Sequence, residues 1–315
     1  MRLPKVALVG GGTAGHVFPA LATKEALEQQ GVSEFVLVSD TRASEKGYLA
    51  PFCPLPVFLM APSGLAYRPS LKGVATGLRL FWGAVRCWRF LKREKVSVVF
   101  ATGSYVGAAA GLAAGWLGIP LVLYEGDASP GRANRRLAKG AKALAVAFQA
   151  AGAAFPKGKG VVTGPPVRLL EAPASQQAAR AVLGLNPELP TLALFGGSQG
   201  AAVLNDFAFK YLLPEATKGH LQVLHQCGAG NLEALKQRLE GRPLPAGYLL
   251  TGFTNEVGTW QKAADLVLSR AGSGTIGEYC LLGTASVLVP LEAGAGGHQR
   301  YNAQALAETG AARLA

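Results

Sequence analysis

The chain has 315 residues, of which half are hydrophobic and only 16% are charged. This composition excludes a disordered protein, and the length exceeds that of one ordinary core, so we expect two domains. The whole net charge of +12 lies in residues 1–165, which carry 20 basic and 8 acidic side chains, whereas residues 166–315 carry 11 of each. The asymmetry predicts an anionic partner for the first half, either nucleic acid, anionic lipid or phosphate.

Three features bear on location and chemistry. The N-terminus carries only the short apolar run Val6–Val9, without an apolar region followed by a cleavage site, so we expect a cytoplasmic protein. The uncharged stretch Val96–Tyr124 is long enough to span a bilayer, but glycines and a proline divide it, so we expect strand, loop, helix and strand. No cysteine pair has a CxxC spacing, which argues against zinc, redox and disulfide frameworks; the cysteines are Cys53, Cys87, Cys227 and Cys280.

Apolar runs alternate with helical patterns, such as Pro19–Gln30 and Ala133–Lys139, along both halves of the chain. This alternation predicts an α/β fold of doubly wound parallel sheets that bind ligands at the carboxyl ends of their strands. Prolines near residues 161–166 predict a hinge between domains 1–163 and 164–315. The strands expected are Val6–Val9, Phe35–Ser39, Val57–Met60, Val96–Ala101, Leu121–Tyr124, Ala141–Ala147, Thr191–Phe195, Gln222–His225, Tyr248–Thr251, Leu266–Ser269 and Ser286–Pro290.

Gly-rich loops recur at matching positions of the two halves. Gly10–Gly15 and Gly196–Gly200 each follow a first strand, and Gly103–Gly107 and Gly272–Gly277 each follow a later one. A Gly-rich turn before a helix exposes backbone N–H groups, which the helix dipole makes a site for anions. One such loop can serve only as a tight turn, but four in matched pairs favour phosphate binding. Hydroxyl donors are available from Thr13, Ser198, Ser273 and Thr275.

The first loop also matches a dinucleotide fingerprint. Gly10, Gly12 and Gly15 have the GxGxxG spacing, and Asp40 ends the second strand where a ribose-binding acid would lie. His16 follows the last glycine directly, and the second half repeats the loop, which one dinucleotide does not require. A nicotinamide enzyme therefore stays the weaker interpretation.

The segment from Gly11 to Ala22, GGTAGHVFPALA, closely resembles the opening signature of the bacterial undecaprenyl-pyrophosphoryl-MurNAc-pentapeptide N-acetylglucosaminyltransferases. The family resemblance implies the GT-B fold, two Rossmann-like doubly wound domains facing a cleft. It also implies inverting transfer of GlcNAc from UDP-GlcNAc to the MurNAc 4-hydroxyl of lipid I, which gives lipid II. The likeness continues in order at Ser63–Leu65, Gly103–Gly107, Gly164–Arg168, Gly196–Gly200, Arg270–Gly272, Glu278, His298–Gln299 and Asn302–Ala303.

Inverting transfer needs a base near the acceptor hydroxyl and donor groups near the leaving diphosphate. His16 is the candidate base, because a neutral imidazole accepts a proton near pH 7; alternatively, it only orients the first loop. We expect His220 and His225 to be structural. The resemblance implies that the acceptor diphosphate binds the N-terminal domain, at Gly12, Thr13, Gly103, Ser104 and Tyr105.

The resemblance further implies that the C-terminal domain binds UDP-GlcNAc. Arg168 and Ser198 would lie at the pyrophosphate, Thr254 at the uracil, and Gln299 with His298 at the GlcNAc hydroxyls. Glu278 would accept from the ribose hydroxyls, or it is only a first-turn helix acid. The remaining donor-site residues are Thr13, Ala14, Gly15, Asp127, Ser273, Gly274, Thr275, Ile276 and Gly277.

The sequence departs from the family pattern in two places. Asp127 stands where the family often has Asn, and a carboxylate accepts but cannot donate a hydrogen bond. The resemblance also implies C-terminal helices beyond Ala315, where this sequence ends.

A basic amphipathic helix is predicted around residues 78–93. Its apolar positions have i, i+3, i+4, i+7 spacing, and arginines repeat every seven residues on a different face. Such a helix can lie on the anionic inner-membrane surface as a peripheral attachment, or it packs on its own sheet with solvated arginines. We find no nucleic-acid recognition motif. The membrane residues expected are Leu78, Phe81, Trp82, Val85 and Trp116, with Arg79, Arg86 and Arg93 beside them.

Three other functions stay open, of which the first is another glycosyltransferase that acts on a soluble or lipid acceptor. A UDP-GlcNAc 2-epimerase-like enzyme shares the two-domain architecture but needs no lipid acceptor, and a non-catalytic sugar-nucleotide or membrane-binding protein would show no turnover. The sequence contains no metal-ligand cluster, so we expect no cofactor and no obligatory metal site. Use of a diffusible Mg²⁺ ion is compatible with this expectation.

Overall fold

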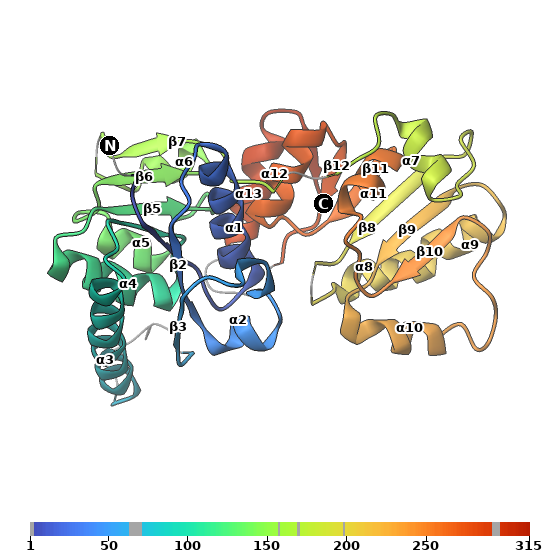
Figure 1. The fold of residues 1–315 in the computed structure, drawn as a ribbon. Helices are drawn as coiled ribbons and strands as arrows, with labels where there is room; N and C mark the ends of the chain where they lie inside the picture. The colour runs from blue at the N-terminus through green and yellow to red at the C-terminus, as the bar shows by residue number, and fades with distance from the viewer. Residues whose placement is uncertain (1–2, 63–70, 157, 169–170, 198, 292–296) are drawn as a thin grey trace. The chain divides into compact units, whose positions relative to one another are not determined.

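The computed structural model describes residues 3–62, 71–156, 158–168, 171–197, 199–291 and 297–315, and gives the backbone alone at residues 71 and 72. The chain divides into two compact units, Met1–Arg168 and Leu169–Ala315 (Figure 1). Each unit is a parallel sheet flanked by helices, which is the predicted α/β architecture.

The N-terminal unit contains, within its described residues, a seven-stranded sheet of order β3-β2-β1-β4-β5-β6-β7, in which all pairs are parallel. Its strands are β1 (Val6–Val9), β2 (Phe35–Asp40), β3 (Val57–Met60), β4 (Val98–Ala101), β5 (Leu121–Glu125), β6 (Ala143–Val146) and β7 (Gly160–Val162). Its helices are α1 (Ala14–Gln29), α2 (Thr41–Glu45), η1 (Ala50–Phe52), α3 (Leu71–Arg93), α4 (Ser104–Leu117), α5 (Arg132–Leu137) and α6 (Gln149–Gly152).

The C-terminal unit repeats this topology in a six-stranded parallel sheet of its described residues, of order β10-β9-β8-β11-β12-β13. Its strands are β8 (Thr191–Phe195), β9 (Gln222–Gln226), β10 (Tyr248–Thr251), β11 (Leu266–Ser269), β12 (Ser286–Leu288) and β13 (Ala312–Leu314). Its helices are α7 (Gln176–Val182), α8 (Ala202–Phe207), the π-helical turn η2 (Ala208–Leu212), α9 (Leu213–Thr217), η3 (Ala229–Asn231), α10 (Leu232–Gln237), α11 (Val257–Ala263), α12 (Ser273–Leu282) and α13 (His298–Ala307).

The central strands are buried on both faces, which is why they are continuous apolar runs rather than alternating ones. In β1, Ala7 and Val9 pack in the layer that contains residues of α3 and α4. Val6 and Leu8 point the other way and pack with α1. The N-terminal sheet is therefore the middle layer of a three-layer sandwich.

The structure corrects two sequence-based expectations. Helix α1 begins at Ala14 instead of Pro19, and it continues through Pro19 because Val17, Ala20 and Leu21 are buried against the sheet. The segment expected to be a hinge begins with β7, which pairs with β6. The division between the units lies after Arg168 rather than at 163/164.

The apolar stretch from Val96 to Tyr124 forms β4, α4 and β5, as predicted. Within the described residues, no helix combines the length and the apolar character needed to cross a bilayer.

Candidate active site

The Gly-rich loops lie at the switch point of each sheet. The strand order reverses between β1 and β4 in the first sheet and between β8 and β11 in the second. The loops after these four strands are the ones that the sequence singles out. In doubly wound sheets, ligands bind in the crevice at the carboxyl ends of such strands, so each unit has one predicted ligand edge.

The helices that follow these loops begin without side-chain caps. Thr13, Gly103 and Gly272 are the residues before α1, α4 and α12, and none of them caps the helix through a side chain. The first N–H groups of a helix have no intrahelical partner, so these three ends can donate to an anion. Thr13 and Gly15 are exposed, and Ala14 is half-buried.

His16 lies in the first turn of α1 with a defined ring orientation. Its Nδ1 lies 2.8 Å from the carbonyl oxygen of Thr102, and a carbonyl can only accept, so Nδ1 carries the proton. A neutral ring then has its lone pair on Nε2. The Thr102 hydroxyl in turn donates to the His16 carbonyl at 2.7 Å, which joins α1 to the end of β4.

Asn134, which no sequence motif singles out, lies close to His16 across Gly103. A Cβ atom added to Gly103 would lie 3.5 Å from Asn134 Nδ2 and 3.5 Å from the His16 ring. Asn134 is 3% exposed; its NH₂ group donates to Tyr124 O and to Glu125 Oε2. Its Oδ1 is buried without a partner among the described residues. A buried amide oxygen without a donor is costly, which favours a ligand hydroxyl or N–H at this position.

Glu125 anchors the loop after β5. It accepts from the backbone N–H groups of Asp127 at 3.0 Å and Gly131 at 2.9 Å. Burial raises the pKa of the Glu125 carboxyl despite these hydrogen bonds. Asp127 is half-buried at the start of this loop, so Glu125 fixes its backbone.

The residues predicted to bind the acceptor diphosphate differ in accessibility. Gly12 lies half-buried in the first loop at φ +83°. Ser104 has φ +69°, and its hydroxyl is buried without a partner among the described residues. The Tyr105 ring is 7% exposed and packs in the core next to α3, so the predicted diphosphate contact would require it to leave that core.

Asp40 caps a helix and does not have the ribose-binding role that it would have in a nicotinamide enzyme. Its side chain accepts from the Ala43 N–H at 3.0 Å and so caps α2. The residue is 3% exposed. A buried capping carboxylate cannot also bind two ribose hydroxyls, which weakens the dinucleotide interpretation.

At the C-terminal ligand edge, Gln299 is oriented by its oxygen. The Gln299 Oε1 atom accepts from the backbone N–H groups of Leu291 at 2.9 Å and Ala271 at 3.3 Å. Only the NH₂ group is then left to face a ligand, so Gln299 can donate to a sugar oxygen but not accept from it. His298 is half-buried at the start of α13.

Glu278 lies on α12, whose first residues Ser273, Gly274 and Thr275 are half-buried. The buried Gln261 side chain donates to Glu278 Oε2 at 3.3 Å. Ile276 and Gly277 are buried, and the Ile276 N–H bonds to the Gly272 carbonyl at 3.0 Å. Neither the Ile276 side chain nor its N–H is therefore available to the donor, contrary to expectation.

Three other predicted donor residues have separate outcomes. The Thr254 hydroxyl accepts from the Glu256 N–H at 3.0 Å, which shapes the turn after the exposed Phe253. Arg168 belongs to the N-terminal unit instead of the C-terminal one, and its Nε lies 3.4 Å from Glu25 Oε1. Ser198 lies outside the described residues, as does the segment Ser63–Leu65.

The remaining histidines, His220 and His225, differ in burial. His225 is fully buried on β9, and burial lowers its pKa to about 4. His220 is on the surface, with Nδ1 2.8 Å from Glu215 Oε2.

The predicted membrane helix α3 has two apolar faces. Ala84, Cys87 and Leu91 are fully buried against the N-terminal sheet. The opposite face exposes Leu78, Phe81 and Trp82, while Val85 is half-buried. Phe81 contacts Trp116 of α4, with ring centroids 5.9 Å apart. The helix therefore packs on its sheet and still presents a second apolar face, with exposed Arg79, Arg86 and Arg93 nearby.

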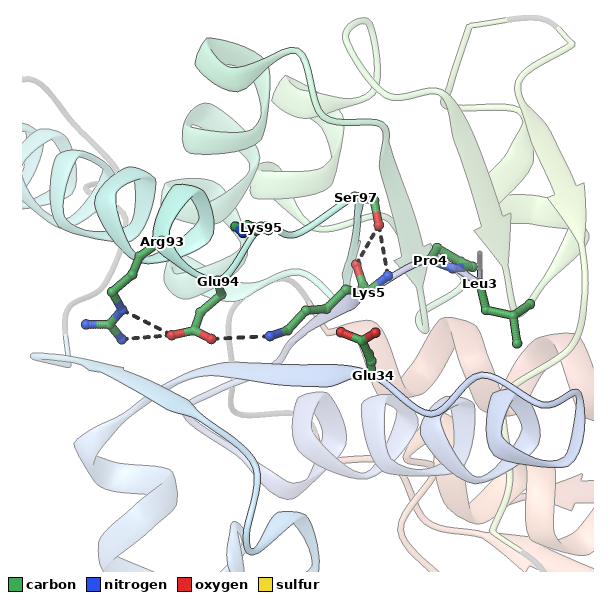
Figure 2. A pocket seen from close by; sticks show the side chains of 8 residues that line it. All are labelled: Leu3, Pro4, Lys5, Glu34, Arg93, Glu94, Lys95 and Ser97. Carbon is green, nitrogen blue, oxygen red and sulfur yellow. Dashed lines mark hydrogen bonds and ion pairs between the residues drawn. The ribbon is translucent and has the colours of Figure 1, made fainter. Parts of the chain in front are cut away.

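A surface pocket of about 500 Å³ lies at the opposite edge of the N-terminal sheet (Figure 2). Lys5, Glu34 and Ser97 come from the segments that lead into β1, β2 and β4. Glu94 pairs with Lys5 at 3.3 Å and with Arg93 at 3.0 Å. Desolvation would raise the pKa of Glu94, but these two cations lower it below its usual value. The pocket lies at the amino ends of the strands, away from the Gly-rich loops.

Comparison with protein families defines the class of the protein. The N-terminal domain profile of glycosyltransferase family 28 matches residues 6–146, and the C-terminal domain profile of the same family matches residues 191–315. The protein is thus a glycosyltransferase with the GT-B type of domain. UDP-GlcNAc 2-epimerase from Methanocaldococcus jannaschii shares the fold (TM-score 0.62 over 99% of this chain and 88% of that chain), at only 13% identity.

Full-length relatives narrow the class further. The chain is 39% identical, over 98% of its length and 87% of the relative's, to the UDP-N-acetylglucosamine–N-acetylmuramyl-(pentapeptide) pyrophosphoryl-undecaprenol N-acetylglucosamine transferase of Thermus thermophilus. The transferase of the same name from Leuconostoc mesenteroides is 36% identical, over 98% and 85%. MurG of Acinetobacter baumannii superposes with a TM-score of 0.72 at 30% identity, over 99% of this chain and 86% of that one. The chain belongs to this family of N-acetylglucosaminyltransferases.

Proposed function

We propose that the chain transfers GlcNAc from UDP-GlcNAc to the MurNAc 4-hydroxyl of lipid I, with inversion, and so forms lipid II in peptidoglycan synthesis. The observation that carries the proposal is the repetition of an uncapped Gly-rich loop at the switch point of both sheets, with the His16 ring at the first. One unit is thereby suited to an acceptor diphosphate and the other to a nucleotide diphosphate.

His16 is proposed as the general base. Because Nδ1–H donates to Thr102 O, the lone pair on Nε2 can take the proton of the 4-hydroxyl. The hydroxyl oxygen then bonds to the sugar C1 while the bond from C1 to the UDP oxygen breaks, and UDP leaves with the electron pair. Asn134 Oδ1, close to the His16 ring across Gly103, is proposed to accept from the acceptor sugar, which requires a local movement because this oxygen is buried.

The donor site is proposed at the Gly-rich loops of the C-terminal unit. Glu278 would accept from the ribose hydroxyls, and Gln299 would donate to a GlcNAc oxygen through its NH₂ group. The uncapped start of α12 would place partial positive charge at the leaving diphosphate. This charge favours the transition state because negative charge develops on UDP as the bond breaks.

The test measures UDP release from UDP-GlcNAc with and without a short-chain lipid I analogue. We expect release only with the acceptor, and a loss of about 10²- to 10⁴-fold in kcat for His16→Gln, since general base catalysis has that range. His220→Gln, at a surface histidine of the other unit, is the matched control and should keep full activity. Release without acceptor would instead favour an epimerase or hydrolase, and UDP binding without turnover would favour a non-catalytic binding protein.

The exposed face of α3 is proposed to attach the protein to an anionic membrane. Leu78, Phe81, Trp82 and Trp116 present contiguous apolar and aromatic surface, and large exposed apolar patches mark interaction sites. Arginines beside such a face add electrostatic attraction to anionic lipids. The acceptor is lipid-linked in this proposal, so attachment would bring the enzyme to its substrate.

Vesicle sedimentation tests the attachment. The double variant Phe81→Ser, Trp82→Ser should bind phosphatidylglycerol vesicles at least about tenfold more weakly, because each buried aromatic ring contributes on the order of 1.5 kcal/mol or more. Val203→Ser, at an exposed apolar residue of the C-terminal unit, is the control. Unchanged binding of the double variant would exclude this face.

A further inference from the structure

The side chain of Arg270 bonds to backbone carbonyl groups and not to a carboxylate. Arg270 follows β11, and its Nη1 atom donates to the carbonyl oxygens of Val289 and Pro290, each at 3.0 Å. The ion pairs of the residues that the structure describes do not include Arg270. Desolvation lowers the pKa of its guanidinium, and a partly desolvated cation needs polar partners. The two carbonyls supply them, so Arg270 is tied to the segment that follows β12.

The peptide group between Pro290 and Leu291 is held at both of its edges. Its C=O accepts from Arg270 Nη1, and its N–H donates to Gln299 Oε1 at 2.9 Å. The C=O and the N–H belong to one planar unit, so a rotation that changes the direction of one also changes the direction of the other. Arg270 and Gln299 therefore act on the same peptide group from opposite sides.

A second peptide group, between Arg270 and Ala271, is held in the same way. Its N–H donates to Gln299 Oε1 at 3.3 Å, and its C=O accepts from the Ser269 hydroxyl at 2.9 Å. Ser269 is buried. Both N–H groups that bond to Gln299 thus belong to peptide groups whose carbonyls are fixed by other side chains.

The two N–H groups decide which end of the Gln299 amide faces them. If the amide turned over, its NH₂ group would face two donors, and both hydrogen bonds would be lost. The NH₂ group itself has no partner among the residues that the structure describes. A ligand atom at this position must therefore accept a hydrogen bond, and a ligand atom that can only donate is disfavoured.

We infer that Arg270 is a positioning residue, which acts through the Pro290–Leu291 peptide group to hold the Gln299 amide as a hydrogen-bond donor to the sugar of the nucleotide. The inference rests on the proposed function, because that function places a GlcNAc oxygen at Gln299. Arg270 does not need to touch the sugar, since supporting groups commonly orient the residues that contact a ligand. Recognition of the sugar then depends on Arg270, whereas binding of the UDP part does not.

The test measures the dissociation constants of UDP-GlcNAc and of UDP by calorimetry for Arg270→Met, Gln299→Ala and the double variant. Methionine keeps an unbranched apolar stem but cannot donate a hydrogen bond. Because UDP lacks the sugar, the ratio of the UDP-GlcNAc constant to the UDP constant isolates the sugar contacts. Gln176→Met removes a half-buried donor to the Ala264 carbonyl, ahead of the other end of β11, and is the control for destabilisation alone.

We expect Arg270→Met to raise this ratio about five- to tenfold, the effect of one lost hydrogen bond, and to leave the UDP constant within about twofold. Gln299→Ala should raise the ratio by a similar factor. The double variant should be no worse than Gln299→Ala, because the two residues act through one contact with the sugar. Arg270→Lys, which can still donate to the two carbonyls, should restore most of the ratio, and Gln176→Met should not change it.

Amide hydrogen exchange in the ligand-free chain tests the positioning without any nucleotide. The Leu291 N–H bonds to Gln299 Oε1, and we expect it to exchange at least about fivefold faster in Arg270→Met, since its peptide group is then held at one edge only. Gln176→Met should leave this rate unchanged. If Arg270→Met does not fold, Arg270→Gln replaces it, because this shorter side chain is too far from the two carbonyls, and it should shift both readouts in the same direction.

The outcomes separate two kinds of failure. Equal weakening of UDP and UDP-GlcNAc in Arg270→Met would show that Arg270 acts on the diphosphate, and would overturn the positioning role. Multiplied effects in the double variant, or unchanged exchange at Leu291, would overturn it as well. If the wild-type chain bound no UDP-GlcNAc but Arg270→Met still accelerated exchange at Leu291, the proposed donor site would fail while the control of the Gln299 amide stood.

Discussion

The two switch-point loops follow equivalent strands of two matching sheets, yet they are held in different ways. The loop after β1 is joined to its neighbouring strand by His16 and Thr102, and the tethering residue His16 is itself the candidate base. After β8, Gly200 packs against the carbonyl of Cys227, and this carbonyl accepts from Asn205, a buried residue that also contacts His225. The same topology therefore supports a site whose anchor can also react and a site whose anchor is buried and inert. This difference suits one loop to an acceptor that must be deprotonated and the other to a nucleotide that is only bound.

The largest expected effect comes from adding a side chain where the loop after β8 is tightly packed. Gly200→Ala places a Cβ against the Cys227 carbonyl and should destabilise the protein by about 3 kcal/mol or more, with loss of UDP binding. Gly197→Ala is the matched control, since Gly197 also has positive φ but open space around its Cβ; it should cost only about 1 kcal/mol. Denaturant unfolding measures both, and equal effects would show that packing on Cys227 is unimportant.

The burial of the neutral His225 ring predicts that the stability of the folded chain depends on pH. The pKa of His225 is lowered from 6.5 to about 4 in the folded chain, so the unfolded chain binds more protons between these values. The stabilising contribution is complete above pH 6.5 and is lost as the pH falls toward 4. Unfolding free energy should fall by about 2 kcal/mol between pH 7 and pH 5 through this group. In His225→Gln that part of the slope should vanish, and an unchanged slope would contradict the burial of a neutral ring.

A substitution of Asn134 should affect the acceptor site at the first loop and leave the nucleotide site at the second loop unchanged. Asn134→Ala removes the unpartnered Oδ1 beside His16, and we expect kcat/KM for the acceptor to fall about tenfold, or about 1.4 kcal/mol. UDP affinity should stay unchanged. Steady-state kinetics with varied acceptor, alongside calorimetry with UDP, would reveal the opposite result if Asn134 belonged to the donor site.

The smallest expected effect is at Asp40, which lies close to the first loop but outside its chemistry. Asp40→Ala removes the cap of α2 and should cost about 1 kcal/mol of stability. Transfer activity should persist at temperatures where the variant is folded. Selective loss of nucleotide binding in this variant would revive a ribose-binding role for Asp40.

The fold was largely predictable because both halves repeat strands that are apolar throughout, a pattern that buried parallel strands require. The start of α1 was missed because packing of Val17 and Leu21 overrides the proline signal at Pro19. Asn134 and the buried contacts of His225 with Asn205 and Tyr248 were missed for a different reason. Asn134 is 9 and 10 residues away from its partners, and His225 is 20 and 23 residues away. Tertiary structure brings these residues together, and no short motif records such contacts.

The proposed membrane face of α3 implies a partition equilibrium rather than a permanent anchor. Leu78 and Trp82 are about 60% exposed and Phe81 and Trp116 about half exposed, so neighbouring side chains already cover much of each one. Only the outer part of each residue is left to enter the lipid, and the free energy of transfer scales with that area. Residence on a bilayer would then be brief, and one molecule could leave a patch depleted of lipid I and rebind elsewhere.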